Sequence, residues 1–456
     1  MQPRRRDQSS GRLSTDDPGK TTGRALVIGP YLRQQKSAAG SAIRSPQARM
    51  EEAAGLALAI DLDVIETGIV ALSEIRPATY IGKGKVEEIA GLVKAHDIGL
   101  VVMDCALSPV QQRNLEKAWS AKVLDRTGLI LEIFGKRAQT KEGVLQVELA
   151  HLTYQKSRRV RSGTHLERQR GGFCFLGGPG ETQIEADRRV IEERIARIEA
   201  ELGKVKKRRK LHRASRARVP YPIAALVGYT NAGKSTLFNR VTRAKVLEAD
   251  MLFATLDPTL RAIDLPHGTR VILSDTVGFI SELPTMLVAA FRATLEEVTE
   301  ADVILHVRDI SHEDTEAQLE DVREVLKALG IDEARRGRLI EVWNKIDALD
   351  AEARARVDNM AARVAPDQQP ILVSALTGEG IETLLAAIEA RLAETRIVLD
   401  LVLDGADGAG LSWLHRNTEV IARTSLEDGK VALSVRADPV KAGQVRARFA
   451  GAIPVS

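Results

Sequence analysis

The chain of 456 residues contains very little cysteine, since only Cys105 and Cys174 occur. Two isolated cysteines exclude a disulfide framework, and they lack the paired spacing of a zinc site. We therefore expect a cytoplasmic protein from a reducing compartment, in which both cysteines occupy ordinary packing or loop positions.

Long apolar runs are also missing: no stretch of the sequence approaches the ~20 apolar residues that a membrane-spanning helix requires. The basic triplet at 4–6 is followed by polar residues, which excludes the apolar segment of an export signal. We predict no membrane span, and we predict a disordered polar tail at 1–23.

A strong charge of one sign is absent as well. The 66 basic and 62 acidic residues leave a net charge of +4, which is too small to indicate a partner. Only the local distribution of charge can support an argument for nucleic-acid binding. The length is typical of about three folded domains.

The most informative stretch is an apolar run at 223–227 that leads into Gly-Tyr-Thr-Asn-Ala-Gly-Lys-Ser at 228–235. A strand, a glycine-rich loop and a helix start in this order predict a nucleoside triphosphate site, because backbone N–H groups must curve around a phosphate. Lys234 is expected to reach the β- and γ-phosphates, and Ser235 to offer its hydroxyl to Mg²⁺. The predicted phosphate-loop residues are Gly228, Tyr229, Thr230, Asn231, Ala232, Gly233, Lys234, Ser235 and Thr236.

Two downstream elements complete the predicted phosphate side. Asp275 follows a β-rich run at 271–274 and is expected to hold Mg²⁺, while Gly278 is expected to bring its N–H to the γ-phosphate. Thr255 is expected to complete the Mg²⁺ shell when that phosphate is present. The nucleotide-binding residues predicted here are Phe253, Ala254, Thr255, Asp275, Thr276, Val277 and Gly278. The candidate catalytic residues are Lys234, Thr255 and Gly278, and the candidate metal ligands are Ser235, Thr255 and Asp275.

The base side is predicted from two later strand ends. Asn344, Lys345 and Asp347 follow an apolar run at 339–343, and Ser374 and Ala375 follow another at 371–373. A carboxylate such as that of Asp347 accepts from the two N–H donors of guanine, a pair that adenine lacks. The sequence therefore predicts GTP as the substrate, with five elements on five strand ends.

Residues 24–137 alternate between strand and helix patterns, which predicts a small α/β domain. We expect strands at 25–28, 79–81, 98–103 and 122–125, with helices at 85–96 and 108–120. The turn Gly82-Lys83-Gly84-Lys85 has two interpretations, an anion site at a helix start or a tight strand-to-helix turn. The incomplete glycine pattern favours the turn.

Residues 138–218 are predicted to form an antiparallel hairpin of two amphipathic helices, one at 142–159 and one from 181 to beyond 200. The connecting loop Gly163–Gly180 combines glycines, arginines and the aromatic Phe173 and Phe175. These residue types suit RNA phosphates and unpaired bases. A mobile surface loop is the alternative.

The end of the second helix carries charge of only one sign. The stretch Lys204–Arg218 is rich in basic residues and contains no acidic residue. Like charge in such a run repels itself unless a polyanion neutralises it, so we favour RNA contact over a solvated helix face.

Three stretches together resemble the HflX family of ribosome-binding GTPases, which belongs to the translation-factor-related P-loop GTPases near the Obg group. They are Phe253-Ala254-Thr255-Leu256-Asp257, Asp275-Thr276-Val277-Gly278-Phe279-Ile280, and Gly178-Pro179-Gly180-Glu181-Thr182-Gln183 with Asp187-Arg188-Arg189. The resemblance extends from about residue 24 to the C-terminus. The block at 178–183 is its family-specific part.

The resemblance implies an α/β multidomain protein: an N-terminal α/β nucleotide-binding-like domain at 24–137, a helical hairpin with a Gly-rich loop at 138–218, a P-loop GTPase domain with a mostly parallel sheet at 219–396, and a small α+β C-terminal domain at 397–456. It implies a monomer that binds the large ribosomal subunit and the intact ribosome, contacts ribosomal RNA through Gly163–Gly180 and Lys204–Arg218, and splits or rescues ribosomes under stress. A large-subunit assembly GTPase and a GTP-sensing RNA-binding scaffold remain as alternatives.

The expected mechanism depends on Phe279, which stands where many related GTPases have a glutamine that orients the attacking water. A phenyl ring cannot bond water in this way, so we expect slow intrinsic hydrolysis that a partner stimulates. Asn231 suggests that K⁺ supplies further positive charge near the phosphates, as in some related GTPases.

Overall fold

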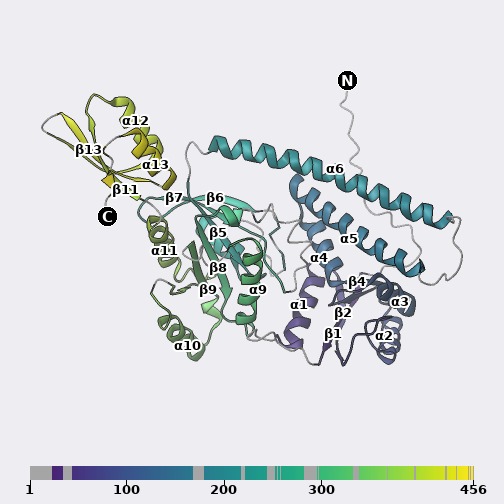
Figure 1. Cartoon of the computed structure of the whole chain (residues 1–456). Coiled ribbons are helices and arrows are strands. Elements are labelled where there is room, and N and C mark those ends of the chain that lie inside the picture. Colours follow the sequence, from purple (N-terminus) through teal and green to yellow (C-terminus); the bar gives the residue numbers. More distant parts are fainter. Residues whose placement is uncertain are drawn as a thin grey trace, which may run out of the picture. The chain divides into compact units, whose positions relative to one another are not determined.

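Figure 1 shows the computed structural model of the chain. It describes residues 23–33, 44–167, 179–216, 221–243, 252–253, 255–256, 258–281, 295, 297–331, 338–366, 368–394, 397–426, 429–437, 439–449, 451 and 453–454. The predicted tail before residue 23 and the part of the predicted glycine-rich loop at 168–178 lie outside these residues. The chain divides into two compact units, residues 1–36 with 45–132 and residues 37–44 with 133–456.

The first unit is built on a parallel sheet of four strands in the order β2-β1-β3-β4. Strand β1 lies between β2 and β3 and is buried from Ala25 to Tyr31, as expected for an apolar run between two strands of a parallel sheet. Its strands are β1 (Arg24–Leu32), β2 (Asp63–Leu72), β3 (Leu100–Met103) and β4 (Lys122–Asp125), and its helices are α1 (Pro46–Leu58), α2 (Lys83–Ala95) and α3 (Pro109–Trp119), with α4 (Arg126–Arg137) following.

The predicted strand at 79–81 is wrong. Tyr80 has a left-handed φ of 66°, and only an isolated bridge links it to Arg76, so this segment is a turn. The second strand of the sheet is instead β2, and α1 precedes it; neither was predicted. Gly82 is therefore the N-cap of α2 after a turn, which corrects the predicted strand-to-helix turn at this position.

A buried polar network occupies the carboxyl edge of this sheet between β1 and β3. The Tyr31 hydroxyl donates to Asp104 Oδ2 at 2.7 Å, and Arg126 donates to both Asp104 Oδ1 and Glu52. Burial raises the pKa of Tyr31, and Asp104 raises it further. Burial lowers the pKa of Arg126, but the two carboxylates outweigh it and raise the pKa overall. The place where the strand order of such a sheet reverses, between β1 and β3, is thus filled by the domain's own side chains.

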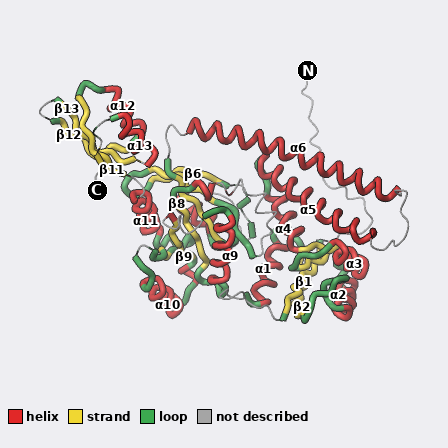
Figure 2. Tube along the Cα trace, viewed as in Figure 1, coloured by secondary structure: helices red, strands yellow, loops and turns green. Residues whose placement is uncertain are grey.

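The helical hairpin belongs to the second unit and consists of α5 (Lys141–Glu167) and α6 (Pro179–Arg216), which run side by side (Figures 1 and 2). A narrow apolar seam joins them. Its buried or partly buried members are Leu145, Leu149, Leu152, Ile191, Ile195, Ile198 and Leu202.

Both helices are longer than predicted. The first continues to Glu167, so Gly163 lies within a helix and not in the loop. A lone glycine costs a helix only about 1 kcal/mol, and no proline interrupts this stretch. The second helix begins at Pro179, because proline is well suited to a first helical turn. It also includes Gly180 and continues through the basic stretch to Arg216.

The GTPase domain has a six-stranded sheet in the order β10-β9-β8-β5-β7-β6, in which only β6 is antiparallel to its neighbour. The strands are β5 (Ile223–Gly228), β6 (Thr259–Asp264), β7 (Arg270–Asp275), β8 (Val303–Asp309), β9 (Leu339–Asn344) and β10 (Ile371–Leu372). The helices are α7 (Lys234–Thr242), α9 (Thr315–Ala328), α10 (Ala351–Ala362) and α11 (Ile381–Glu394), with a 3₁₀ turn at Ile346–Ala348.

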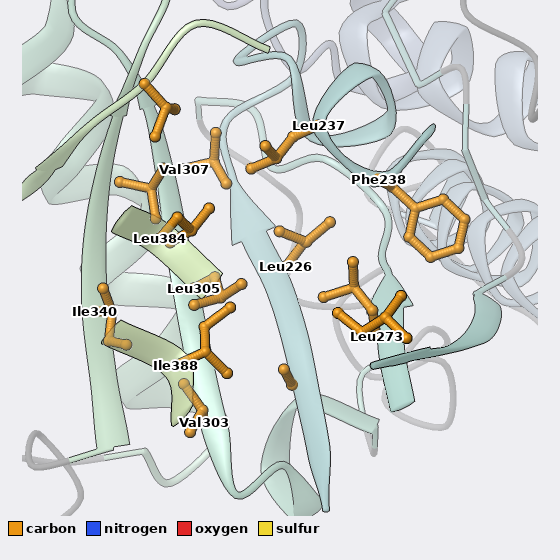
Figure 3. Close-up of a cluster of buried hydrophobic side chains, with 14 of the residues drawn as sticks. Leu226, Leu237, Phe238, Leu273, Val303, Leu305, Val307, Ile340, Leu384 and Ile388 are labelled. Atoms are coloured by element: carbon orange, nitrogen blue, oxygen red, sulfur yellow. The ribbon is translucent and has the colours of Figure 1, made fainter. Parts of the chain in front are cut away.

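The core of this domain surrounds β5. Figure 3 shows Leu226 of β5 among side chains of the neighbouring strands, of α7 and of α11. Leu226, Leu237 and Leu384 are each at most 1% exposed. Because β5 lies between β7 and β8, the loop that follows it begins at the middle of the carboxyl edge, where parallel sheets bind ligands.

The C-terminal part forms an antiparallel sheet in the order β12-β13-β11-β14, with two helices on one face (Figure 2). Alternate residues of β11, such as Leu399 and Leu401, point into the core between sheet and helices, and Trp413 packs against this core. The elements are β11 (Ile397–Asp404), α12 (Gly408–Asn417), β12 (Glu419–Ser425), β13 (Lys430–Ala437), α13 (Pro439–Arg448) and β14 (Ile453–Pro454). In the part of the chain that the structure describes, no helix has the length and apolarity that crossing a bilayer demands.

Replacement of Arg126 by methionine is expected to destabilise the first unit by about 3–5 kcal/mol, because Asp104 and Glu52 would remain buried without their cation. Hydrogen exchange measured by mass spectrometry should show faster opening of β1 and β4. The exposed Arg113 offers a control, and Arg113→Met should leave exchange unchanged. A triple variant that also carries Asp104→Asn and Glu52→Gln should recover stability; no recovery would contradict the charge-based explanation.

Candidate functional site

The phosphate loop between β5 and α7 depends on two glycines in close contact with neighbouring strands. Gly228 has a φ of 150°, and a Cβ there would lie 2.1 Å from the Val307 carbonyl oxygen. Gly233 has a φ of 89°, and a Cβ there would lie 2.2 Å from Asn344 Nδ2. Only glycine fits either position, and Asn231 also adopts a left-handed φ of 62°. The backbone is therefore curved as an anion-binding loop requires.

Lys234 begins α7 and is almost fully buried inside this loop. Its Nζ donates to the carbonyl oxygens of Tyr229 at 2.7 Å and Gly228 at 3.2 Å. Burial lowers the pKa of Lys234 to about 8, against the opposing attraction of Asp275. An ammonium group held only by two neutral carbonyls can exchange them for phosphate oxygens, which carry full negative charge.

The predicted metal ligands come together in one cluster. Ser235 Oγ donates to Asp275 Oδ2 at 2.7 Å, Thr255 Oγ1 donates to the same oxygen at 2.9 Å, and the two hydroxyls are 2.9 Å apart. Asp275 is completely buried, and its Oδ1 has no hydrogen-bond partner among the described residues. Burial raises the pKa of Asp275, although the bond from Ser235 opposes this shift.

This all-oxygen set of donors fits Mg²⁺, which prefers oxygen ligands and commonly takes only one or two protein carboxylates together with phosphates. The orphaned Asp275 Oδ1 supports the fit, because a buried carboxylate oxygen needs a partner. Among the described residues, no group of three or more His, Cys, Asp or Glu side chains gathers as a separate metal site.

The segment after Asp275 is bonded to the phosphate loop. Thr230 N–H donates to the Phe279 carbonyl at 2.7 Å, and Phe279 N–H donates to the Gly228 carbonyl at 3.1 Å. A Cβ at Gly278 would lie 2.8 Å from Thr230 Cγ2, so glycine permits this close approach. The Phe279 side chain is 1% exposed. The segment is therefore positioned by backbone contacts, and the phenyl ring is packed away from solvent.

Tyr229 makes a second connection to this segment. Its hydroxyl accepts from Ser281 N–H at 2.7 Å and from Arg44 at 2.7 Å. The Arg44 guanidinium also lies 4.7 Å from the centre of the Tyr229 ring and pairs with Asp321 at 2.7 Å. Arg44 could not be predicted from the sequence, because no local pattern relates it to a residue 185 positions away.

On the base side, Asn344 links three loops. Its Nδ2 donates to the Ala232 carbonyl at 2.9 Å, and its Oδ1 accepts from Ala375 N–H at 3.0 Å. Lys345 has a left-handed φ of 67° and pairs with Asp309 at 2.7 Å. Asp347 is exposed in the following 3₁₀ turn. Asp309 ends a parallel strand just as Asp275 does, so the strand-end rule could have identified it.

A further missed residue is Arg240 of α7. It donates to the carbonyl oxygens of Ala375, at 3.0 Å, and Leu376, so the phosphate-loop helix holds the loop after β10. Within that loop the Ser374 hydroxyl accepts from Thr377 N–H at 3.0 Å.

Other predicted residues have structural contacts or lie outside the description. The Thr276 hydroxyl donates to the Leu226 carbonyl at 2.5 Å, and Val277 is buried. Thr236 lies within α7, and Ala254 is outside the described residues. The five predicted sequence elements of the site were all expected to follow a strand. Four of them do, after β5, β7, β9 and β10, but the element with Thr255 precedes the antiparallel edge strand β6.

Comparison with protein families gives four matches in chain order. They are a GTP-binding GTPase N-terminal region at 47–135, a GTP-binding GTPase middle region at 137–216, a 50S ribosome-binding GTPase at 223–345 and an HflX C-terminal domain at 359–455. The GTPase HflX of Magnetococcus marinus is 50% identical over 382 residues, which cover 84% of this chain and 86% of that protein. The chain belongs to the HflX family.

The GTPase HflX of Escherichia coli is 45% identical over 380 residues, covering 82% of this HflX-family chain and 87% of that relative. A solved GTP-binding protein from Sulfolobus solfataricus in complex with GDP is 23% identical with a TM-score of 0.43, covering 81% of this chain and 99% of that one. The protein is a GTPase of a ribosome-associated family, and the predicted resemblance and α/β multidomain fold are confirmed.

We expect Gly233→Ala to weaken GTP binding on the order of 10- to 100-fold, because the methyl group would displace Asn344 and leave its partners unpaired. Titration with a fluorescent GTP analogue measures this. Gly330→Ala is a matched control, since Gly330 also has a positive φ (79°) but nothing lies within 4 Å of its Cβ position. Both variants should lose roughly 1–2 kcal/mol of stability. Equal GTP affinities would contradict the steric explanation.

Proposed function

We propose that this HflX-family GTPase binds the large ribosomal subunit and the intact ribosome, and that GTP hydrolysis times the splitting or rescue of ribosomes under stress. The observation that carries this proposal is the burial of Phe279 at the position expected to orient water. The phosphate loop and the oxygen cluster are assembled, but Phe279 cannot orient the attacking water. Efficient hydrolysis therefore requires a partner.

In this proposal Lys234 leaves the carbonyls of Gly228 and Tyr229 for the β- and γ-phosphates of GTP. Asp275, Ser235 and Thr255 hold Mg²⁺, which neutralises the charge that develops on the phosphates. Gly278 offers its N–H to the γ-phosphate. Phe279, the residue after Gly278, is hydrogen-bonded to the phosphate loop through its backbone. The segment that contains both residues therefore responds directly to the γ-phosphate.

We propose that the base is read by Asp347, with Asn344, Lys345, Ser374 and Ala375 shaping its pocket. The exposed carboxylate of Asp347 is free to accept the two N–H donors of guanine. Asn344 supports this role because it ties the phosphate loop to the loop after β10.

Ribosomal RNA is the partner that suits the end of α6. The described apolar seam with α5 extends to Leu202, and Lys204 and Lys207 beyond it are exposed. Exposed lysines on a helix that continues to Arg216 can neutralise phosphates. The segment Gly163–Gly180, whose two ends belong to α5 and α6, is proposed as the second RNA contact.

Asp347→Asn is expected to transfer preference from GTP to xanthosine triphosphate, because an amide can donate to the xanthine oxygen that replaces the guanine amino group. Competition of the two nucleotides for hydrolysis measures the change. Asp350→Asn, three residues on at a helix N-cap, controls for loss of a nearby carboxylate. Retained GTP preference in Asp347→Asn would contradict the assigned role.

Steady-state GTP hydrolysis is expected to be slow for the protein alone and to rise at least ~10-fold with large subunits and with intact ribosomes, but not with small subunits. Sedimentation should then show subunits appearing from intact ribosomes. Stimulation by immature large particles alone would favour the assembly alternative. No stimulation by any particle would contradict the ribosome proposal.

The proposed RNA contacts of Lys204 and Lys207 are tested by measuring ribosome binding at several salt concentrations. Lys204→Gln combined with Lys207→Gln should weaken ribosome binding and reduce the steepness of its salt dependence. The control, Lys83→Gln combined with Lys117→Gln, changes two exposed lysines of the first unit and should have neither effect.

We also propose that Asn231 helps to hold K⁺ near the phosphates. Equal rates of GTP hydrolysis in KCl and NaCl would exclude this.

A further inference from the structure

Phe253 is an unusual residue in the loop that carries Thr255. Its side chain is only 2% exposed, although it lies in a connecting segment before the edge strand β6. Its backbone has a left-handed φ of 58°, which is rare and costly for a bulky residue. Such a conformation persists only when the surrounding contacts hold it in place, so the burial of Phe253 must have a strong partner.

That partner is Phe134 in the last turns of α4. The two ring centroids lie 4.7 Å apart with an angle of 75° between the ring planes, which is an edge-to-face contact. Phe134 is 1% exposed and is among the largest fully buried side chains of the protein. An edge-to-face pair of rings stabilises the fold beyond the burial of its area alone. Both residues belong to the second compact unit.

The contact restricts Thr255. Two residues of chain reach at most about 7 Å, so an immobilised Phe253 limits how far Thr255 can move. Leu256, on the other side of Thr255, is only 3% exposed. Between these two buried side chains, Thr255 Oγ1 lies 2.9 Å from both Ser235 Oγ and Asp275 Oδ2. The hydroxyl is thus confined to the oxygen cluster by packing on both sides.

We propose that Phe134 is a positioning residue for GTP hydrolysis: it acts through Phe253 to hold Thr255 at the oxygen cluster. The residue lies 121 positions from Thr255 in sequence, in the N-terminal family region at 47–135 and not in the matched GTPase region at 223–345. Only three residues separate the end of α4 at Arg137 from the start of the hairpin at Lys141. A partner that shifts the hairpin would therefore act close to this contact. The proposal rests on the role of Thr255 proposed above.

The test is a double-mutant cycle in the full-length protein, with Phe134→Leu, Phe253→Leu and the double variant. Leucine fills much of the space but removes the ring contact. Each single variant should lower kcat for GTP about three- to tenfold with KM changed less than about twofold, because the contact affects the geometry of Thr255 and not the binding of the base. The double variant should be no slower than the slower single one, because both changes remove one shared interaction.

Three controls make the outcome decisive. Leu152→Ala removes a buried contact in the hairpin seam; it should lower thermal stability without lowering kcat. Thr255→Ala tests the underlying role by itself: an unchanged kcat there would refute the role of Thr255. Two outcomes would refute the role of Phe134 but not that of Thr255. One is a lowered kcat in Thr255→Ala with an unchanged kcat in Phe134→Leu, and the other is additive effects in the double-mutant cycle. If circular dichroism shows that Phe134→Leu is unfolded, Phe134→Met, whose flexible side chain adapts to the cavity, takes its place in the cycle.

Discussion

The buried carboxylate of Asp275 is the constraint on which the site depends. A completely buried charge costs several kcal/mol unless hydrogen bonds or an opposite charge compensate it. Two hydroxyls donate to one oxygen, and the other oxygen is left for a cation. Satisfying this one group brings together the start of α7, the loop before β6 and the end of β7. These are the segments that sense the γ-phosphate in the proposed mechanism.

The second constraint is how closely backbones approach each other. Gly228 and Gly233 let the phosphate loop contact Val307 and Asn344, and Gly278 lets the next segment contact Thr230. Such close contacts, with backbone atoms at Val307 and with side-chain atoms at Asn344 and Thr230, are possible because glycine has no side chain. The regions proposed to bind the phosphates, the metal and the base therefore share one hydrogen-bonded edge of the sheet.

Residues far away in sequence are attached to this edge by side chains. Arg44 reaches the Tyr229 hydroxyl, and Phe134 packs on Phe253. Both contacts act on segments next to phosphate-binding positions. They give the regions outside the nucleotide-binding motifs a physical route to influence hydrolysis, as the proposed stimulation by a partner requires.

The sequence by itself determined the positions of the phosphate loop, Asp275 and Asn344, because each belongs to a short pattern that directly follows a strand. It also determined the family, through the stretches at 253–257 and 275–280 and the family-specific block at 178–183. It failed for β2 and α1, whose weak patterns gain stability only by packing on β1. Only the tertiary structure decided the contacts of Arg44 and Phe134 and the network of Arg126, since such pairings depend on how distant elements pack, and no local spacing records them.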